Sequence, residues 1–399
     1  MPVSEEAEMV RNVVVFMVLL FASLSTAITL TPVWEITRPE EWAEIEKIAI
    51  HYDGSSHPLV ICKTDSSVFT VDHTGTVHTI WMFTQNDTQT ERFHCSSLGR
   101  YIAISTTWAE GDSGRTGVRV MDAAGTLIWE VVNTPYSYIS LADSGPWSVS
   151  SIPQIGREST WDNNLLIRDP SGAIIHERIY EGHGGVDISD DGSRTFILGA
   201  DSIRCFDNQG SHLWTVKDPP SELECYWSVG SAATTSGAIF VEHYNIGLAS
   251  SGKVFFRDSL GVASQSVTVT GGYGSLDISE NGEYVVLGAY GTFYLIRRSP
   301  PSVAWSVVDP GGNEARLYCS ANISGDGNFV VGAVSRGDSL ISRLEIFNTA
   351  GAELFEEQYP TIGRIAVEMT DDGVYLIVMK EQLTSLGRDQ MLTLYEIGS

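Results

Sequence analysis

The sequence predicts an all-β fold made of eight similar units, and a repeated glycine is the main observation behind this prediction. The glycine recurs with neighbouring copies 45 to 47 residues apart. Most copies follow polar residues, as in Asp371-Asp372-Gly373, and lie between two apolar segments. Because glycine adopts positive φ without strain, this pattern favours a tight turn between antiparallel strands. The eight copies are Gly54, Gly99, Gly145, Gly192, Gly237, Gly282, Gly327 and Gly373.

A second repeated pattern places another turn in each unit. It consists of an aspartate or asparagine, a glycine three positions later and, in some copies, an aromatic residue four positions after the glycine. The first side chain caps its own type I turn, and the glycine takes the left-handed position. With two turns and the loop between them, each unit contains four strands, named a to d in chain order. The complete copies are Asp122-Gly125-Trp129, Asp207-Gly210-Trp214 and Asn348-Gly351-Phe355, and copies without the aromatic residue are Asp72-Gly75, Asp169-Gly172 and Asp258-Gly261.

Four antiparallel strands per unit at this spacing are typical of a β-propeller, so eight glycines predict eight blades. The last unit has room for only three strands, and residues 31–37 resemble the outer strands of other units. We therefore expect this N-terminal strand to pair with residues 391–397 and to close the ring, which removes exposed sheet edges. Residues 28–399 then form a single propeller domain. Near its start, Glu40 to Ile48 fits either a short helix or the first inner strand.

The two turn patterns also support a family resemblance. The Asp-x-x-Gly-x-x-x-Trp turns resemble the repeats of PQQ-like, quinoprotein-type propellers, and the Ser-x-Asp-Gly-x-Tyr turns are similar to those of WD40-like and TolB-like propellers. The resemblance implies a fold that hosts enzymes, scaffolds and binding modules alike. Quinoprotein dehydrogenases typically carry an adjacent cysteine pair, whereas the five cysteines here are far apart in sequence. The resemblance therefore implies neither a quinone cofactor nor its chemistry.

The N-terminal segment, residues 1–27, reads as a signal peptide. An apolar run from Val13 to Leu24 follows Arg11, and Ser25-Thr26-Ala27 supplies the small residues of a cleavage site. Because the residues before Met9 are acidic, translation starting at Met9 is an alternative beginning. An uncleaved membrane anchor is the other interpretation of the apolar run. The cleaved signal predicts an extracytoplasmic protein, periplasmic or secreted, in a bacterium.

The charge balance limits the classes of partner. The chain has 50 acidic and 24 basic residues, for a formal net charge of −26. Such a surface repels the phosphates of nucleic acids and anionic lipid headgroups. We therefore expect no nucleic-acid partner and, once the signal is removed, no membrane partner.

One column of residues, five positions before the repeated glycine, is expected to face the central channel. Converging carboxylates there could hold a hard cation such as Ca²⁺. The alternative, that these side chains make hydrogen bonds between blades, is favoured because Ser140 and Ala232 interrupt the column. We therefore predict no metal or other cofactor. The polar members of the column are His94, Asp187, Asp277, Asn322 and Glu368.

The loops between strands b and c vary most in length, and in a propeller they share one face with the d–a connections. Variable loops on a rigid scaffold commonly carry recognition. The longer loops contain tryptophans and arginines, which predict a protein or glycan partner, although each arginine could instead tie its loop to a neighbouring acidic blade. These residues are Trp108, Arg115, Arg157, Trp161, Arg336 and Arg388.

The function predicted from these patterns is a non-catalytic, exported binding or scaffold module. The competing prediction is an enzyme with its site at the channel mouth, either a polysaccharide lyase or hydrolase or a degenerate quinoprotein. Carboxylates and aromatic residues clustered at that mouth would favour the enzyme.

Overall fold

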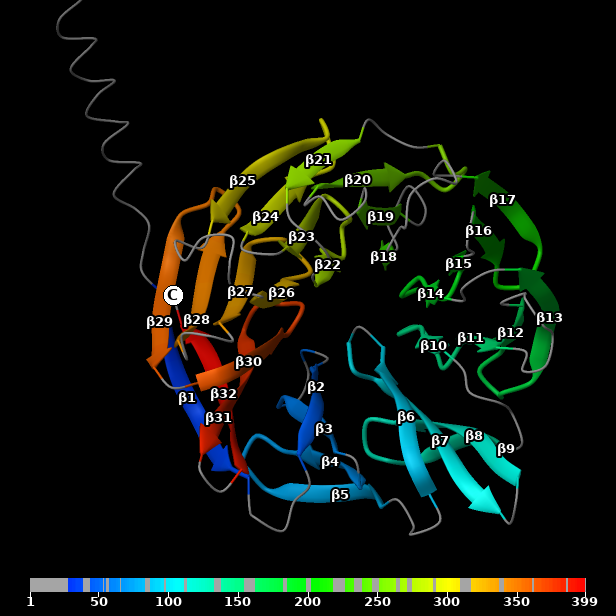
Figure 1. Ribbon diagram of the computed structural model, residues 1–399, viewed down its shortest axis with the longest axis horizontal. Helices are drawn as coiled ribbons and strands as arrows, with labels where there is room; N and C mark the ends of the chain where they lie inside the picture. Colours follow the sequence, from blue (N-terminus) through cyan, green and yellow to red (C-terminus); the bar gives the residue numbers. More distant parts are fainter. Residues whose placement is uncertain are drawn as a thin grey trace, which may run out of the picture.

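The computed structural model shows four-stranded antiparallel sheets arranged as the blades of a ring around a central channel (Figure 1). Among the described residues there are eight such sheets and no helix, and so no helix that could cross a membrane. The predicted eight-bladed propeller is confirmed. The structure describes residues 28–38, 44–52, 54, 57–64, 66–82, 87–96, 98–110, 113–132, 138–153, 162–181, 185–198, 202–217, 227–232, 239–245, 251–262, 266–270, 275–289, 292–308, 317–336, 341–360, 362–384 and 387–398. The proposed signal peptide, residues 1–27, lies outside them.

Each of the first seven blades consists of four consecutive strands in the order a, b, c, d from the channel outward. Blades 1 and 2 contain β2 (Ile45–His51), β3 (Leu59–Thr64), β4 (Ser67–Val71), β5 (Val77–Met82), β6 (Asp87–Cys95), β7 (Tyr101–Glu110), β8 (Ser113–Asp122) and β9 (Leu127–Val132). Blades 3 and 4 contain β10 (Tyr138–Leu141), β11 (Ser148–Pro153), β12 (Asp162–Arg168), β13 (Ile174–Glu181), β14 (Gly185–Ile188), β15 (Arg194–Leu198), β16 (Ser202–Asp207) and β17 (His212–Lys217).

The second half of the ring repeats this arrangement. Blades 5 and 6 contain β18 (Trp227–Ala232), β19 (Ile239–Asn245), β20 (Ser251–Arg257), β21 (Val267–Thr270), β22 (Leu276–Ile278), β23 (Tyr284–Ala289), β24 (Thr292–Arg297) and β25 (Ser302–Val308). Blade 7 contains β26 (Leu317–Ile323), β27 (Phe329–Arg336), β28 (Ile341–Asn348) and β29 (Glu353–Pro360). Blade 8 combines β30 (Ile362–Met369), β31 (Tyr375–Thr384) and β32 (Gly387–Gly398) with β1 (Thr29–Thr37).

Blade 8 is closed by the N-terminal strand, as the sequence predicts. The strand β1 pairs antiparallel with β32, with Thr37 opposite Met391 and Leu30 opposite Ile397. Figure 1 shows this dark blue strand beside the red end of the chain. The segment that fitted either a helix or a strand forms the inner strand β2 from Ile45 onward. The two ends of the chain therefore share one sheet.

The hydrophobic core is divided among the seams between blades. In one seam, Ile61 and Val68 of blade 1 pack with Ile102, Ile104 and Met121 of blade 2, and all five side chains are buried. A comparable cluster joins the strands of blades 6 and 7. Because each sheet buries both faces against its neighbours, the blades stabilise one another around the ring.

Six of the c–d turns contain a glycine with a second role, which the sequence pattern did not reveal. Gly172 has φ of +83°, and a Cβ added there would lie 2.7 Å from Cγ of Trp129, on the outer strand of the preceding blade. The indole N–H of Trp214 similarly donates to the Ser259 carbonyl oxygen of the next blade at 3.1 Å. At the outer seams, a large side chain of one blade therefore packs directly on a turn glycine of the next blade, which has no side chain of its own. The contacts of this kind are Trp34–Gly75, Ile80–Gly125, Trp129–Gly172, His176–Gly210, Trp214–Gly261 and Trp305–Gly351.

The a–b turns also make contacts between blades, and Gly145 corrects one expectation. Trp147 packs on Gly192, and Phe329 packs on Gly373 of the following blade. Gly145 does not adopt the positive φ expected of the repeated glycine, unlike the other described copies. The turn around Gly145 is also bonded differently, because the N–H groups of Asp143 and Ser144 donate to the Asp190 carbonyl oxygen of the next blade.

Candidate functional site

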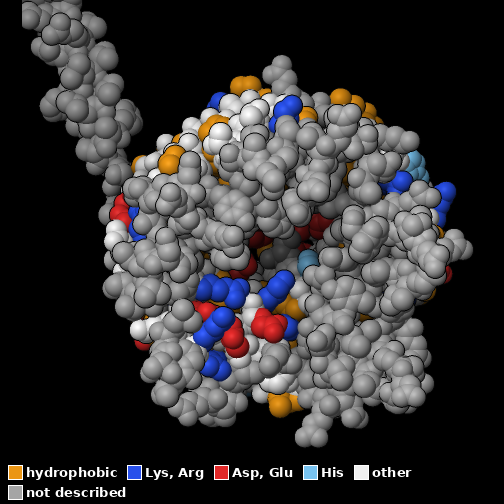
Figure 2. Space-filling view, viewed as in Figure 1, with side chains coloured by type: hydrophobic (Ala, Val, Ile, Leu, Met, Phe, Trp, Pro, Cys, Tyr) orange, Lys and Arg blue, Asp and Glu red, His pale blue; other side chains and the backbone are white. Residues whose placement is uncertain are grey.

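The central channel contains a cavity of about 390 Å³. Its wall comes from the inner strands β2, β6, β10, β14, β22, β26 and β30 and from the a–b turns that follow several of them. Figure 2 shows acidic side chains inside the opening of this channel. The predicted channel residues His94, Asp187, Asp277, Asn322 and Glu368 all lie in its wall, each on a different inner strand.

Asn322 connects three blades through hydrogen bonds. Its side-chain nitrogen donates to Asp277 Oδ2 at 3.3 Å in blade 6 and to Glu368 Oε2 at 3.2 Å in blade 8. Its side-chain oxygen accepts from the backbone N–H of Met369 at 2.7 Å, and Asp277 accepts from the N–H of Ile323 at 2.9 Å. The amide and both carboxyl groups therefore bond across the seams between inner strands.

A similar contact joins blades 3 and 4. The Ser140 hydroxyl donates to Asp187 Oδ1 at 3.1 Å, and the backbone N–H of Ile188 donates to the same oxygen at 2.9 Å. The serine that interrupts the column of acidic residues is thus a hydrogen-bond donor to one of them. These contacts match the inter-blade interpretation of the column.

Sequence analysis missed a second ring of acidic residues in the a–b turns. Asp190, Glu280 and Asp371 line the same cavity, and each lies two positions before the repeated glycine. The corresponding residue of blade 7 is Gly325, where an added Cβ would lie 3.1 Å from Asp371 Cβ and 3.2 Å from Glu280 Oε2. Side chains of blades 6 and 8 therefore approach each other across blade 7. Aligning the repeats on their glycines would have identified this column.

Burial and mutual repulsion change the acidity of the channel carboxyls. Burial raises the pKa of Asp277 to about 6. Burial and the nearby Asp277 charge raise the pKa of Glu368 to about 7, although Lys47 opposes this shift. Burial and four neighbouring carboxylates raise the pKa of Asp371 to about 8. Burial lowers the pKa of His94 to about 4. The folded channel therefore holds protons at neutral pH that ordinary carboxyls release.

A hard cation such as Ca²⁺ would need several oxygen ligands that converge in the channel. Among the residues that the structure describes, no group of three or more His, Cys, Asp or Glu side chains is arranged to hold a metal ion. The chemistry available to these carboxyls is proton uptake and release, together with hydrogen bonding to backbone amides.

The predicted loop-face residues that the structure describes belong to three blades. Trp108 on β7 and Arg115 on β8 are opposite each other in the register of blade 2. Arg336 ends β27 of blade 7, and Arg388 is near the start of β32 of blade 8. Arg157 and Trp161 lie outside the described residues. The described positions are at the b–c ends of their blades, but they lie within strands and not in the loops expected from the sequence, and their role in binding stays a prediction.

Arg388 is engaged within the protein. Its guanidinium contacts Glu44 at 3.0 Å and Glu381 at 3.2 Å, and its backbone oxygen accepts from the Arg38 side chain at 2.8 Å. This arrangement matches the interpretation in which a loop arginine ties its loop to a neighbouring blade. The Arg388 side chain is 51% exposed, so its outer surface still faces solvent.

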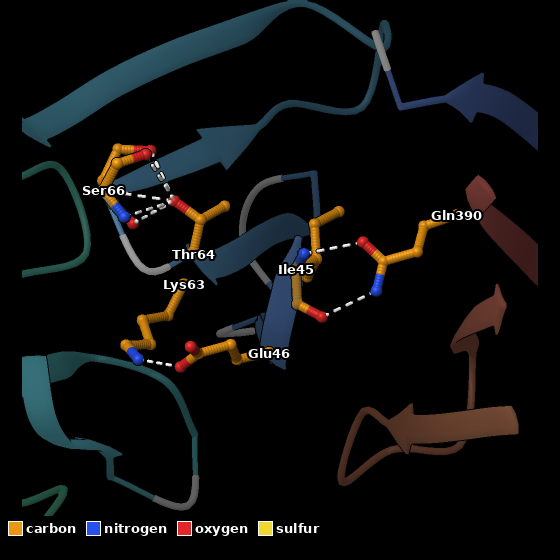
Figure 3. A network of polar contacts seen from close by, with 7 residues as sticks. Ile45, Glu46, Lys63, Thr64, Ser66 and Gln390 are labelled. Carbon is orange, nitrogen blue, oxygen red and sulfur yellow. Dashed lines mark hydrogen bonds and ion pairs between the residues drawn. The ribbon is translucent and has the colours of Figure 1, made fainter. Parts of the chain in front are cut away.

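Gln390, which sequence analysis did not single out, joins blade 8 to blade 1. Its side-chain oxygen accepts from the Ile45 N–H at 2.6 Å, and its side-chain nitrogen donates to the Ile45 carbonyl oxygen at 2.9 Å (Figure 3). The side chain is buried. Nearby, Lys63 pairs with Glu46. No sequence repeat marks this contact, because it occurs only where the two ends of the chain meet.

Basic side chains gather beside the channel opening where blades 8 and 1 meet (Figure 2). We define the seam basic patch as Arg38, Lys47, Arg364 and Arg388. Arg38 bonds to Arg388, Arg364 is opposite Glu381, which Arg388 contacts, and Lys47 lines the channel cavity. Lys47, Arg364 and Arg388 are exposed and Arg38 is partly buried. Acidic residues such as Glu44 lie among them, yet the concentration of positive charge is notable in a chain of net charge −26.

Comparison with known proteins supports the fold. No family model matches the chain, and no curated protein matches it. Among solved structures, the chain is similar to the dihydro-heme d1 dehydrogenase NirN in complex with DHE, with a TM-score of 0.56, 12% identity and coverage of 84% of this chain and 74% of that chain. It is also similar to a structure described as the eukaryotic initiation factor, with a TM-score of 0.50, 13% identity and coverage of 80% and 89%. The resemblance to quinoprotein-type and WD40-like propellers is thus confirmed for the fold.

Proposed function

We propose that this protein is a non-catalytic binding or scaffold module that takes a protein or glycan partner on its loop face, the face of the b–c and d–a connections. The proposal rests mainly on one observation, which is that the polar side chains of the channel make hydrogen bonds between blades. Asp187, Asp277, Asn322 and Glu368 bond to neighbouring blades, so they serve to hold the ring together. Recognition is then left to the variable loops on this rigid ring.

The charge on the loop face favours an anionic partner. The seam basic patch is at the b–c and d–a ends of blades 8 and 1, and the loop arginines Arg115, Arg157 and Arg336 are predicted to share this face, whereas the chain as a whole is strongly acidic. A partner surface of opposite charge associates faster, and repulsion between like charges disfavours the binding of other partners. Acidic protein segments and acidic glycans both have the charge that this surface accepts.

The test is affinity capture with the mature protein, followed by a glycan array if no protein is retained. We expect the Arg157→Ala/Arg336→Ala double variant, and separately Arg364→Glu, to lose the partner. Arg298→Glu, in the c–d turn of blade 6 on the opposite face, is the matched control and keeps it. Retention of the partner by both loop-face variants would contradict the proposal.

Export is part of the proposed function. The apolar run and the small residues before Ile28 support a cleaved signal. Cell fractionation is expected to recover the protein outside the cytoplasm, with Ile28 as its first residue by N-terminal sequencing. Recovery in the cytoplasm would contradict export, and a membrane-bound chain that keeps residues 9–27 would support the anchor instead.

A catalytic channel is the second candidate, and the observation that favours it is the set of carboxyls with raised pKa in the cavity wall. Groups of this kind act as general acids in polysaccharide cleavage. Assays on a panel of polysaccharides, comparing the wild type with Glu368→Gln, separate the two functions. Cleavage lost in the variant supports the enzyme, and a partner bound without any cleavage supports the binding module.

A further inference from the structure

Three carboxyl groups from two blades meet around the inner strand of blade 7. Asp277 and Glu368 both accept hydrogen bonds from the Asn322 side-chain amide. Asp371 lies against Gly325, which is three residues after Asn322 in the same blade. The backbone N–H of Gly325 donates to the Asp371 carbonyl oxygen at 2.7 Å. Blades 6, 7 and 8 are therefore connected at the channel by a short series of contacts, all adjacent to acidic side chains.

The charged groups facing this cluster are mostly of the same sign. Asp190, Glu280 and Asp143 act on Asp371 from blades 4, 6 and 3. Lys47 of blade 1 is the positive group acting on Glu368, and it also acts on His94 of blade 2. His94 remains uncharged above about pH 5, because its pKa is lowered to about 4. Loss of protons from the three carboxyls would thus leave negative charges in a wall that contains few positive ones.

We propose that Asp277, Glu368 and Asp371 form a pH-sensitive latch. When the cluster holds protons, the inner strands of blades 6, 7 and 8 remain joined around Asn322. When it is ionised, repulsion between the carboxylates loosens these strands at the channel. The latch acts through the inner strands β22, β26 and β30, and it needs no ligand.

The direction of the effect follows from proton binding. Each carboxyl has a raised pKa in the folded protein, so the closed latch binds more protons than an open one near neutral pH. Opening that brings the carboxyls into water releases these protons, and opening therefore becomes easier as pH rises. Below about pH 6 the latch is closed, and above about pH 8 it is weakened.

Hydrogen exchange at the Ile323 and Met369 amides tests the latch directly, because these N–H groups donate to Asp277 and Asn322. After correction for the intrinsic pH dependence of exchange, we expect the opening constant to rise by up to about tenfold per pH unit for each proton released, between pH 6 and 8. Glu368→Gln and Asp371→Asn should each flatten this slope. Glu353→Gln, which neutralises an exposed carboxyl on the outer strand β29, should leave it unchanged.

A flat wild-type profile would overturn the proposal, and so would equal slopes in the wild type and both channel variants. Infrared absorption of protonated carboxyl groups in the wild type provides a test without substitutions. Those bands should be present at pH 6 and lost by about pH 9, and their absence at pH 6 would also overturn the latch. Calcium or a chelator should leave the exchange profile unchanged, and a profile shifted by calcium would replace the proton latch with a cation site.

Discussion

At their outer seams, neighbouring blades contact each other through large side chains packed on turn glycines, whereas at the channel they contact through carboxyl, amide and hydroxyl groups. The outer contact keeps the same form, a large side chain on a turn glycine, and in four of the six described cases the side chain is a tryptophan, as in Trp129 on Gly172 and Trp305 on Gly351. The inner contacts differ from blade to blade, with Asn322 bridging two carboxyls and Ser140 donating to one. The free energy contributed by apolar packing does not depend on pH, whereas the contribution of buried carboxyl groups does. One ring therefore combines outer seams of one general form with a centre whose polar contacts differ from blade to blade.

The largest expected effect comes from removing β1, which supplies the outer strand of blade 8. Deleting residues 28–38 removes the pairing with β32 and the packing of Trp34 on Gly75. We expect a loss greater than the roughly 3–5 kcal/mol of a single large core truncation, together with aggregation through the newly exposed strand edge. Thermal unfolding of the shortened chain measures this, and an unchanged transition would contradict the closure.

Truncating one docking side chain should have the next largest effect. Trp129 is buried at 7% exposure, so Trp129→Ala is expected to lower the free energy of unfolding by about 3–5 kcal/mol. Its neighbour Ile128 is 36% exposed, and Ile128→Ala on the same strand is the control, with a loss below about 1 kcal/mol. Urea unfolding measures both. Equal losses would show that the outer seam depends on general hydrophobicity and not on the docked indole.

The channel should respond to pH where the outer seam does not. The folded-state pKa values of Glu368 and Asp371, about 7 and about 8, are above their ordinary values, so they stabilise the fold at low pH and cease to do so as pH rises through them. Between pH 6.5 and 8.5 we expect a fall of about 2–3 kcal/mol in the free energy of unfolding. The double variant Glu368→Gln/Asp371→Asn should remove this fall, whereas Trp129→Ala should retain it at lower overall stability.

A smaller contrast separates two glycines with similar backbone conformations. Gly172 has φ of +83° and would place a Cβ 2.7 Å from Trp129, whereas Gly54 has φ of +75° and no heavy atom within 4 Å of an added Cβ. Both alanine substitutions incur backbone strain of about 1 kcal/mol, and only Gly172→Ala adds a steric clash, for a total of about 2–3 kcal/mol. Equal destabilisation by the two would show that the turn glycine serves backbone conformation alone.

The smallest expected effects concern the seam between blades 8 and 1. Gln390 is 1% exposed and satisfies both backbone groups of Ile45, so Gln390→Ala should cost about 1–3 kcal/mol. Arg388 forms its ion pairs with a side chain 51% exposed, and Arg388→Ala should cost less than about 1 kcal/mol. The decrease in unfolding temperature measured for each variant ranks the two contacts. A larger decrease for Arg388→Ala would show that its ion pairs, and not Gln390, contribute most to closing this seam.

The sequence carried much of this fold because its signals are local. Blade number followed from the spacing of one glycine, and the pairing of β1 with β32 followed from the missing outer strand of the last unit. The docking of Trp129 on Gly172 was not evident because the two residues are in adjacent units, and the pattern within each unit suggested only a turn. The exception at Gly145 was not predictable from the repeat alone, because its turn bonds to Asp190 of the adjacent blade.

The candidate site was predictable only in part. The channel column containing Asp277 and Glu368 could be placed from its distance to the glycine, but which groups share Asn322 depends on how adjacent blades are packed. The approach of Glu280 and Asp371 across Gly325 is likewise a property of three blades together. Roles for Trp108 and Arg336 on the loop face remain predictions. The structure describes the strands that contain these two residues, but not their side chains.

The division between a binding face and a structural channel is tested most directly by one capture experiment with three proteins at pH 6.5. We predict that the wild type and the channel variant Glu368→Gln/Asp371→Asn retain the same partner, and that Arg157→Ala/Arg336→Ala does not. A partner lost from the channel variant but retained by the arginine variant would contradict this prediction and would place recognition inside the ring.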